Sequence, residues 1–97
     1  MKNFRTYRIA VDFYSSVAAL KVPKHLKDQL ERASSSIALN LAEGAGRFGV
    51  KDQKRFYHIA FGSLRECQAI LDLTGKNPPA CEIADKLAAH LYCLIRS

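Results

Sequence analysis

The sequence lacks the features of an exported, membrane-spanning or disulfide-bonded protein. It has no run of about 18 consecutive apolar residues, which a membrane span would need. Its N-terminus also lacks the unbroken apolar core of a signal peptide, so we expect a cytoplasmic protein. The three cysteines, Cys67, Cys81 and Cys93, are odd in number and form no CxxC pair. This argues against a disulfide scaffold or a zinc site and favours small core residues in a reducing compartment.

What is present is the composition of one small globular domain with an excess of positive charge. The 97 residues are 48% hydrophobic and 25% charged, so we expect a single domain over residues 1–97. Fifteen Lys and Arg residues against nine Asp and Glu residues give a formal net charge of +6. This balance favours acidic partners such as nucleic acid or an anionic surface.

Apolar residues at helical spacing predict four helices and no strand, at about 6–21, 23–43, 50–74 and 80–96. Gly44 is expected to end the second helix and Gly75 the third. Asn77-Pro78-Pro79 predicts a stiff turn before the fourth. Short connections imply antiparallel neighbours, so we predict an all-α, up-down-up-down antiparallel four-helix bundle.

The first predicted helix carries two apolar stripes. The stripe expected to face the core consists of Tyr7, Ala10, Val11, Tyr14, Val17 and Ala18. The second consists of Ile9, Phe13 and Leu20. A monomeric bundle needs only one inward stripe per helix, so we predict that the second forms an oligomer interface. The alternative is that Phe4 and the loops fold over it.

The apolar seam of the second predicted helix consists of Leu26, Leu30, Ala33, Ile37 and Leu41, and we expect it to face the core. A polar seam borders it and contains Ser36, Asn40 and Glu43. We predict that these groups form a structural hydrogen-bonded network that fixes helix register or subunit pairing. In the third helix, the small pair Gly62-Ser63 is expected to allow close approach by a neighbouring helix.

Motifs for catalysis or cofactor binding are weak. Gly44, Gly46 and Gly49 spell G-x-G-x-x-G, but a helix precedes them, whereas a dinucleotide-binding turn follows a strand. None of the glutamates is followed by histidine at the Glu-x-x-His spacing of di-iron bundles. No pairing of a nucleophile with a base can be identified either. We therefore expect no enzyme activity, no metal and no cofactor.

Basic residues gather where the bundle topology would bring three segments to one end. These segments are the start of the first helix, the loop between the second and third, and the end of the fourth. Together with the polar face of the third helix, they supply the predicted phosphate contacts Arg5, Arg8, Arg47, Lys51, Lys54, Arg55 and Arg65. Lys2 and Arg96 would lie at the same end. The alternative is a merely solvated face.

Two stretches resemble a known family. They are Gln29-Leu30, Arg32-Ala33, Ser36-Ile37, Asn40 and Ala42-Glu43-Gly44 in the second helix, and Lys51-Asp52, Arg55-Phe56, Ile59-Ala60, Gly62-Ser63-Leu64 and Glu66 in the third. The sequence resembles the bacterial four helix bundle proteins encoded in intervening sequences of 23S ribosomal RNA genes. It is also similar to the accessory variability determinant protein of diversity-generating retroelements. At position 50 the family usually has a Ser or Thr cap where this chain has Val50, so Gly49 is the expected cap.

The resemblance implies a four-helix bundle that assembles into a ring, typically a homopentamer, with no known enzymatic activity. The retroelement relative implies binding to a reverse transcriptase and to nucleic acid. We therefore expect a non-catalytic oligomeric bundle that binds the RNA or DNA backbone through a basic pole, as an accessory to a nucleic-acid enzyme. The alternative is a structural or protein-interaction module without nucleic-acid affinity.

Overall fold

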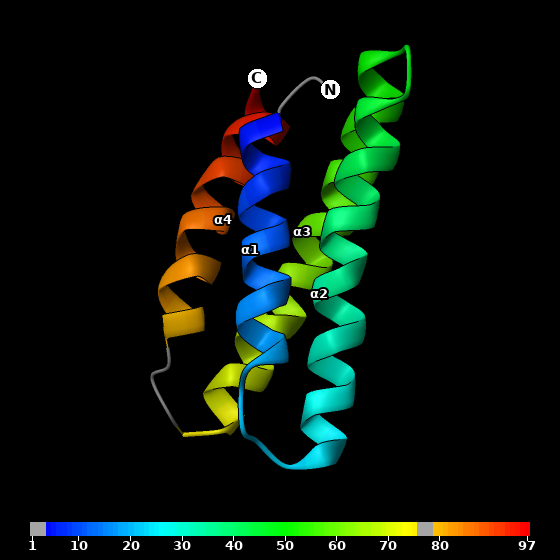
Figure 1. Ribbon diagram of the computed structural model, residues 1–97. Coiled ribbons are helices and arrows are strands. Elements are labelled where there is room, and N and C mark those ends of the chain that lie inside the picture. Colours follow the sequence, from blue (N-terminus) through cyan, green and yellow to red (C-terminus); the bar gives the residue numbers. More distant parts are fainter. Residues whose placement is uncertain (1–3, 76–78) are drawn as a thin grey trace.

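The computed structural model describes residues 4–75 and 79–97, and all regular secondary structure in these residues is helical. The helices are α1 (Phe4–Ala18), α2 (Lys24–Ala45), α3 (Val50–Leu73) and α4 (Pro79–Arg96). Each helix packs against two others: α1 and α3 both contact α2 and α4, and the α2–α3 contact is the most extensive. The α2–α3 connection lies at the same end of the molecule as the start of α1 and the end of α4, which we call the hairpin end (Figure 1). The all-helical prediction is confirmed for the described residues.

The core is built from one buried stripe of each helix. In α2 the stripe includes four residues of the predicted apolar seam, Leu30, Ala33, Ile37 and Leu41, and the fifth, Leu26, is half-buried against the core. The buried hydrophobic residues of the other helices are Ile9, Ala10, Phe13, Val17, Tyr57, Ala60, Leu64, Cys67, Ile70, Leu71, Ala80, Ala84, Leu87 and Leu91. Burial of these side chains is the main force that holds the helices together.

The buried face of α1 lies between the two stripes that the sequence suggested. Phe13 is fully buried and Ile9 is 7% exposed within the single chain, so their assignment to an oligomer interface is wrong. Leu20 is half-buried and packs against the same core. Tyr14, expected inside, is 39% exposed. Its hydroxyl is best placed near water, whereas the Phe13 ring has no polar atom to hydrate.

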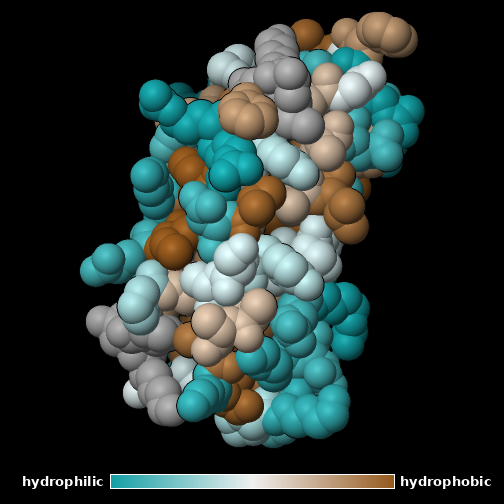
Figure 2. Space-filling model, in the orientation of Figure 1, coloured by the Kyte–Doolittle hydropathy of each residue, from teal (hydrophilic) through white to brown (hydrophobic). Residues whose placement is uncertain are grey.

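The face of the molecule seen in Figure 2 shows apolar side chains in separate spots among polar ones. It shows no unbroken apolar band along α1, which lies at the front of this view. This agrees with the burial of Ile9 and Phe13 inside the chain.

The three cysteines have different environments. Cys67 is buried in the core, Cys81 is half-buried and Cys93 is exposed, so the expectation of three core cysteines holds only for Cys67. Burial raises the pKa of the Cys67 thiol to about 12. This thiol therefore stays protonated and unreactive in the folded protein at neutral pH.

Gly44 lies inside α2, at a close approach to α3. The prediction that Gly44 ends the helix is wrong, because α2 continues to Ala45 and Gly46 follows as its C-cap. A β-carbon on Gly44 would lie 2.8 Å from Cε1 of Tyr57 and 3.1 Å from the carbonyl oxygen of Gln53. At Gly62, where close approach was predicted, a β-carbon would have no neighbour within 4 Å. The small residue that packing requires is therefore at position 44.

The close contacts at Gly44 and the open space at Gly62 predict opposite changes in stability when each glycine is replaced by alanine. Gly44→Ala is expected to lower the free energy of unfolding by about 1–3 kcal/mol, because the added methyl group forces α2 and α3 apart. Gly62→Ala is the matched control and should raise it by about 0.5–1 kcal/mol, since alanine is the better helix former. Urea denaturation followed by circular dichroism measures both. Equal effects of the two substitutions would contradict the close approach at Gly44.

The helix ends are set by local features. Gly49 is extended and is the N-cap of α3, as expected from the sequence. Gly75 follows α3 with a positive φ of 68°, a conformation that glycine adopts without strain. The Lys27 ammonium donates a hydrogen bond of 2.8 Å to the carbonyl oxygen of Ala18, the last residue of α1. The predicted turn at Asn77-Pro78-Pro79 lies outside the described residues, except for Pro79, with which α4 begins.

In the described part of the chain, no helix is both long and apolar enough to span a membrane.

Candidate nucleic-acid interface

The outer side of α3 carries a row of basic side chains that we call the α3 basic face. It consists of Lys51, Lys54, Arg55, His58 and Arg65. On a helical wheel, all five lie away from the buried stripe of α3. Lys54 is half-buried and the other four are exposed. At 1.5 Å per residue, the face extends about 21 Å along the helix.

Two adjoining hollows follow this face. The first is nearest the hairpin end and is lined by Gly49, Lys51, Asp52, Lys54, Arg55 and His58. The second lies between α3 and α4 and is lined by His58, Phe61, Arg65, Tyr92 and Ile95. His58 lines both, so the two hollows adjoin and lead from the hairpin end toward the middle of α3.

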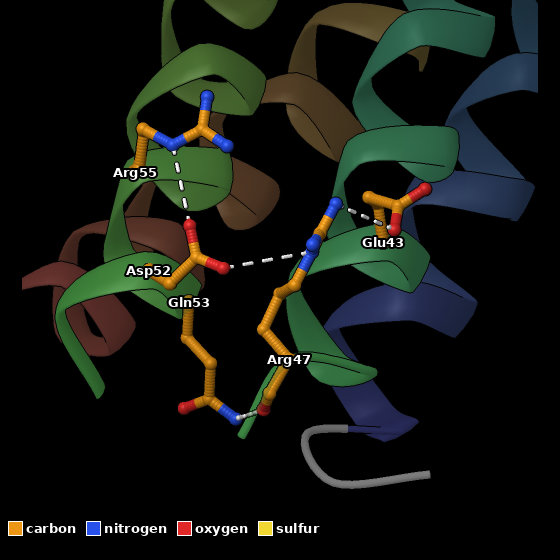
Figure 3. Close-up of polar contacts among 5 residues, drawn as sticks. All are labelled: Glu43, Arg47, Asp52, Gln53 and Arg55. Carbon is orange, nitrogen blue, oxygen red and sulfur yellow. Dashed lines mark hydrogen bonds and ion pairs between the residues drawn. The ribbon is translucent and has the colours of Figure 1, made fainter. Parts of the chain in front are cut away.

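Ion pairs cross the α2–α3 connection at the hairpin end. The Arg47 guanidinium lies 3.2 Å from the Glu43 carboxylate and 3.7 Å from that of Asp52 (Figure 3). Asp52 also lies 3.3 Å from Nε of Arg55. The side-chain amide of Gln53 donates a hydrogen bond of 2.8 Å to the Arg47 carbonyl oxygen. Asp52 therefore links two arginines that were predicted to contact phosphates.

The same two arginines lie against one aromatic ring. The guanidinium carbons of Arg47 and Arg55 are 4.8 Å and 4.4 Å from the centre of the Phe56 ring. These distances are within the range of cation–π attraction. Arg47 and Arg55 thus help to hold the α2–α3 connection, and part of their charge is neutralised by carboxylates.

Lys51 and Lys54 are the less compensated cations of this region. Among the described residues, no carboxylate lies within 4.0 Å of either ammonium group. Together with Arg47 and Arg55 they supply four positive charges, against the two carboxylates Glu43 and Asp52. The first hollow and its surroundings therefore keep a positive excess that the two lysines account for.

The structure does not gather all predicted phosphate contacts on one face. Arg5 and Arg8 are exposed on α1, which makes no contact with α3 in the described residues. They share the hairpin end with the α3 basic face but belong to a helix across the bundle from it. Lys2 lies outside the described residues. Arg65 is farther along α3, at the second hollow.

The polar seam of α2 forms hydrogen bonds that reach α3. The side-chain amide of Asn40 donates to the carbonyl oxygen of Ser36 at 2.9 Å and lies 3.1 Å from its hydroxyl. The Ser36 hydroxyl lies 3.0 Å from that of Ser63 on α3. Glu43 takes no part in these contacts and instead pairs with Arg47. Ser63, which was singled out only for its size, is the third member of the network.

The sequence interpretation assigned no role to the aromatic residues of the second hollow. Tyr92 is 52% exposed, and Arg96 lies over its ring at 5.5 Å. Phe61 is half-buried, with the Arg65 guanidinium 4.6 Å from its ring centre. Only the packing of α3 against α4 brings these residues together. Within the described residues, no group of three or more His, Cys, Asp or Glu side chains is arranged to hold a metal ion.

The sequence matches the 23S rRNA-intervening sequence protein family over residues 2–78, about four fifths of the chain. The chain belongs to this family. The matched region contains α1, α2 and α3, and therefore the whole α3 basic face, whereas α4 lies beyond it. No curated protein matches the sequence. The relation to the retroelement protein stays a prediction.

Proposed function

We propose that the protein is a non-catalytic bundle that binds the phosphate backbone of RNA or DNA through the α3 basic face. The observation that carries the proposal is the row of five basic side chains on one face of α3, beside the two hollows. Lysine and arginine contacts to phosphates release counterions, which makes binding favourable and sensitive to salt. The family name, which refers to 23S rRNA, supports an RNA-related role.

In this proposal Lys51 and Lys54 are the principal phosphate contacts. Arg55 uses its Nε atom for Asp52, and its two terminal nitrogens extend away from that carboxylate (Figure 3). Those terminal nitrogens supply further donors to a phosphate. Such contacts position a backbone without reading bases, so sequence preference should be weak.

The alternative, an assembly module without nucleic-acid affinity, rests on fewer observations. Two of the three residues predicted for the oligomer interface, Ile9 and Phe13, are buried inside the chain. A homopentameric ring and a reverse-transcriptase partner rest on the resemblance alone. Both remain compatible with phosphate binding, because a ring would repeat the α3 basic face.

Removing the carboxylate that links the two arginines is expected to strengthen binding. Asp52→Asn removes one negative charge and both ion pairs that Asp52 makes. We expect about threefold tighter binding to a fluorescein-labelled RNA hairpin, and a slope of log K against log salt that is steeper by up to about one unit. Fluorescence anisotropy in a salt series measures both quantities.

Glu82→Gln is the matched control for this experiment. Glu82 is exposed in the first turn of α4, away from the hairpin end, and its loss changes the net charge by the same amount. Its effect on affinity should be less than twofold. Weaker binding by Asp52→Asn, or equal effects of the two substitutions, would contradict a phosphate-binding role for this region.

A further inference from the structure

The second hollow places two aromatic rings directly beside the α3 basic face. Phe61 comes from α3 and Tyr92 from α4, and both line a hollow of about 340 Å³ together with Ile95. This volume is at the lower end of the range seen for sites that hold a small ring system. Tyr92 is 52% exposed, so a large part of its surface is accessible from solvent.

An arginine lies beside each of these rings. Arg65 lies over Phe61 and donates a 2.7 Å hydrogen bond to Gln68, which fixes its position. Arg96 donates a 3.1 Å hydrogen bond to the Tyr92 hydroxyl. His58 joins the hollow to the lysines of the first one. Cations beside accessible rings are the arrangement that single-stranded nucleic acids require, because the backbone needs charge and each base needs a surface to stack on.

Between α3 and α4, the side-chain charge changes from positive to negative on the side of Arg65 that faces away from the hairpin end. Arg65 also lines a third hollow, whose other polar lining residues, Gln68, Asp72, Cys81 and Asp85, lie farther from the hairpin end. Its two carboxylates would repel a phosphate backbone. A bound strand would therefore extend from the hairpin end to Arg65 and no farther, and its last bases would lie at Phe61 and Tyr92.

We propose that the hollow between α3 and α4 is a base-stacking site, and that the protein therefore prefers single-stranded nucleic acid to a duplex. The inference rests on the proposed function, since the phosphates must follow the α3 basic face. A duplex keeps its bases paired inside, where Tyr92 cannot reach them. An unpaired strand presents bases that stack on the Tyr92 ring, and such stacking tolerates any base sequence.

A tryptophan probe tests the stacking directly, because the chain has no tryptophan of its own. Tyr92→Trp keeps an aromatic surface in the hollow. Leu39→Trp is the control, on an α2 side chain that is 68% exposed and lines neither hollow. Both variants are titrated with a single-stranded oligouridine and with an RNA duplex of the same length, while anisotropy of the labelled RNA records binding.

We expect single-stranded RNA to quench the fluorescence of Tyr92→Trp and to leave that of Leu39→Trp unchanged. In the same assay, Tyr92→Ala should weaken single-strand binding about tenfold, whereas Tyr92→Phe should keep it within about twofold. The duplex should bind more weakly, with an affinity that Tyr92→Ala does not alter.

Two other results would contradict the stacking site, and they differ in what they imply for the proposed function. Salt-sensitive binding without quenching of Tyr92→Trp, and with no effect of Tyr92→Ala, would overturn the stacking site while leaving the proposed function intact. Absence of binding to either RNA at low salt would overturn both.

Discussion

Phe13→Ala is expected to lower the free energy of unfolding by about 3–5 kcal/mol. Phe13 is fully buried in the single chain, and it is the largest of the fully buried side chains in the described residues. Its truncation removes apolar contacts and leaves a cavity between α1 and its neighbours. Small domains have total stabilities of about 5–15 kcal/mol, so this loss is a large fraction of the whole. Thermal unfolding followed by circular dichroism should show a midpoint lower by about 15 °C or more.

Tyr14→Ala provides the control on the same helix. Tyr14 is 39% exposed, so its truncation should cost clearly less than that of Phe13. The experiment also decides between a core role and an interface role for Phe13. If Phe13→Ala kept the stability of each chain and only dissociated an oligomer in light scattering, the burial of Phe13 within one chain would be refuted.

The double substitution Lys51→Glu/Lys54→Glu is expected to weaken RNA binding by at least about 100-fold. Each lysine would lose a charge-assisted phosphate contact, typically worth about 1.5–3 kcal/mol, and each glutamate would add repulsion. Neither lysine has a carboxylate partner among the described residues, so folding should be little affected. Anisotropy measures the affinity, and the far-ultraviolet circular dichroism spectrum should stay unchanged.

Lys21→Glu/Lys86→Glu is the matched control, because it changes the net charge by the same amount at exposed positions outside both hollows. It should weaken binding by less than about fivefold. Similar losses in the two double variants would mean that binding follows overall charge and not the α3 basic face.

The helices of this protein were predictable because their apolar residues recur at helical spacing. Of the predicted apolar seam of α2, Leu30, Ala33, Ile37 and Leu41 are buried, and Leu26 is half-buried against the same core. On α1 the prediction failed because two apolar stripes flank the buried face, and periodicity alone cannot choose between them. Gly44 was misread for a different reason. Glycine commonly ends helices, and only the distance to Tyr57 reveals that it serves packing instead.

The candidate site was predictable in part. The basic residues of α3 lie on one polar face of a single helix, so helical periodicity finds them. The partners of Arg47 and Arg55 depend on the path of the α2–α3 connection, which sequence spacing does not specify. Tyr92 comes from a different helix, and its position beside Phe61 depends on how α4 packs against α3.

The central claim is that the α3 basic face binds a phosphate backbone, and a salt series on the unmodified protein tests it most directly. Anisotropy of a labelled single-stranded RNA is measured from about 50 to about 200 mM salt. Engagement of the four Lys and Arg residues of this face predicts a log–log slope of about −3. Affinity that is absent at low salt, or that does not change with salt, would contradict the claim.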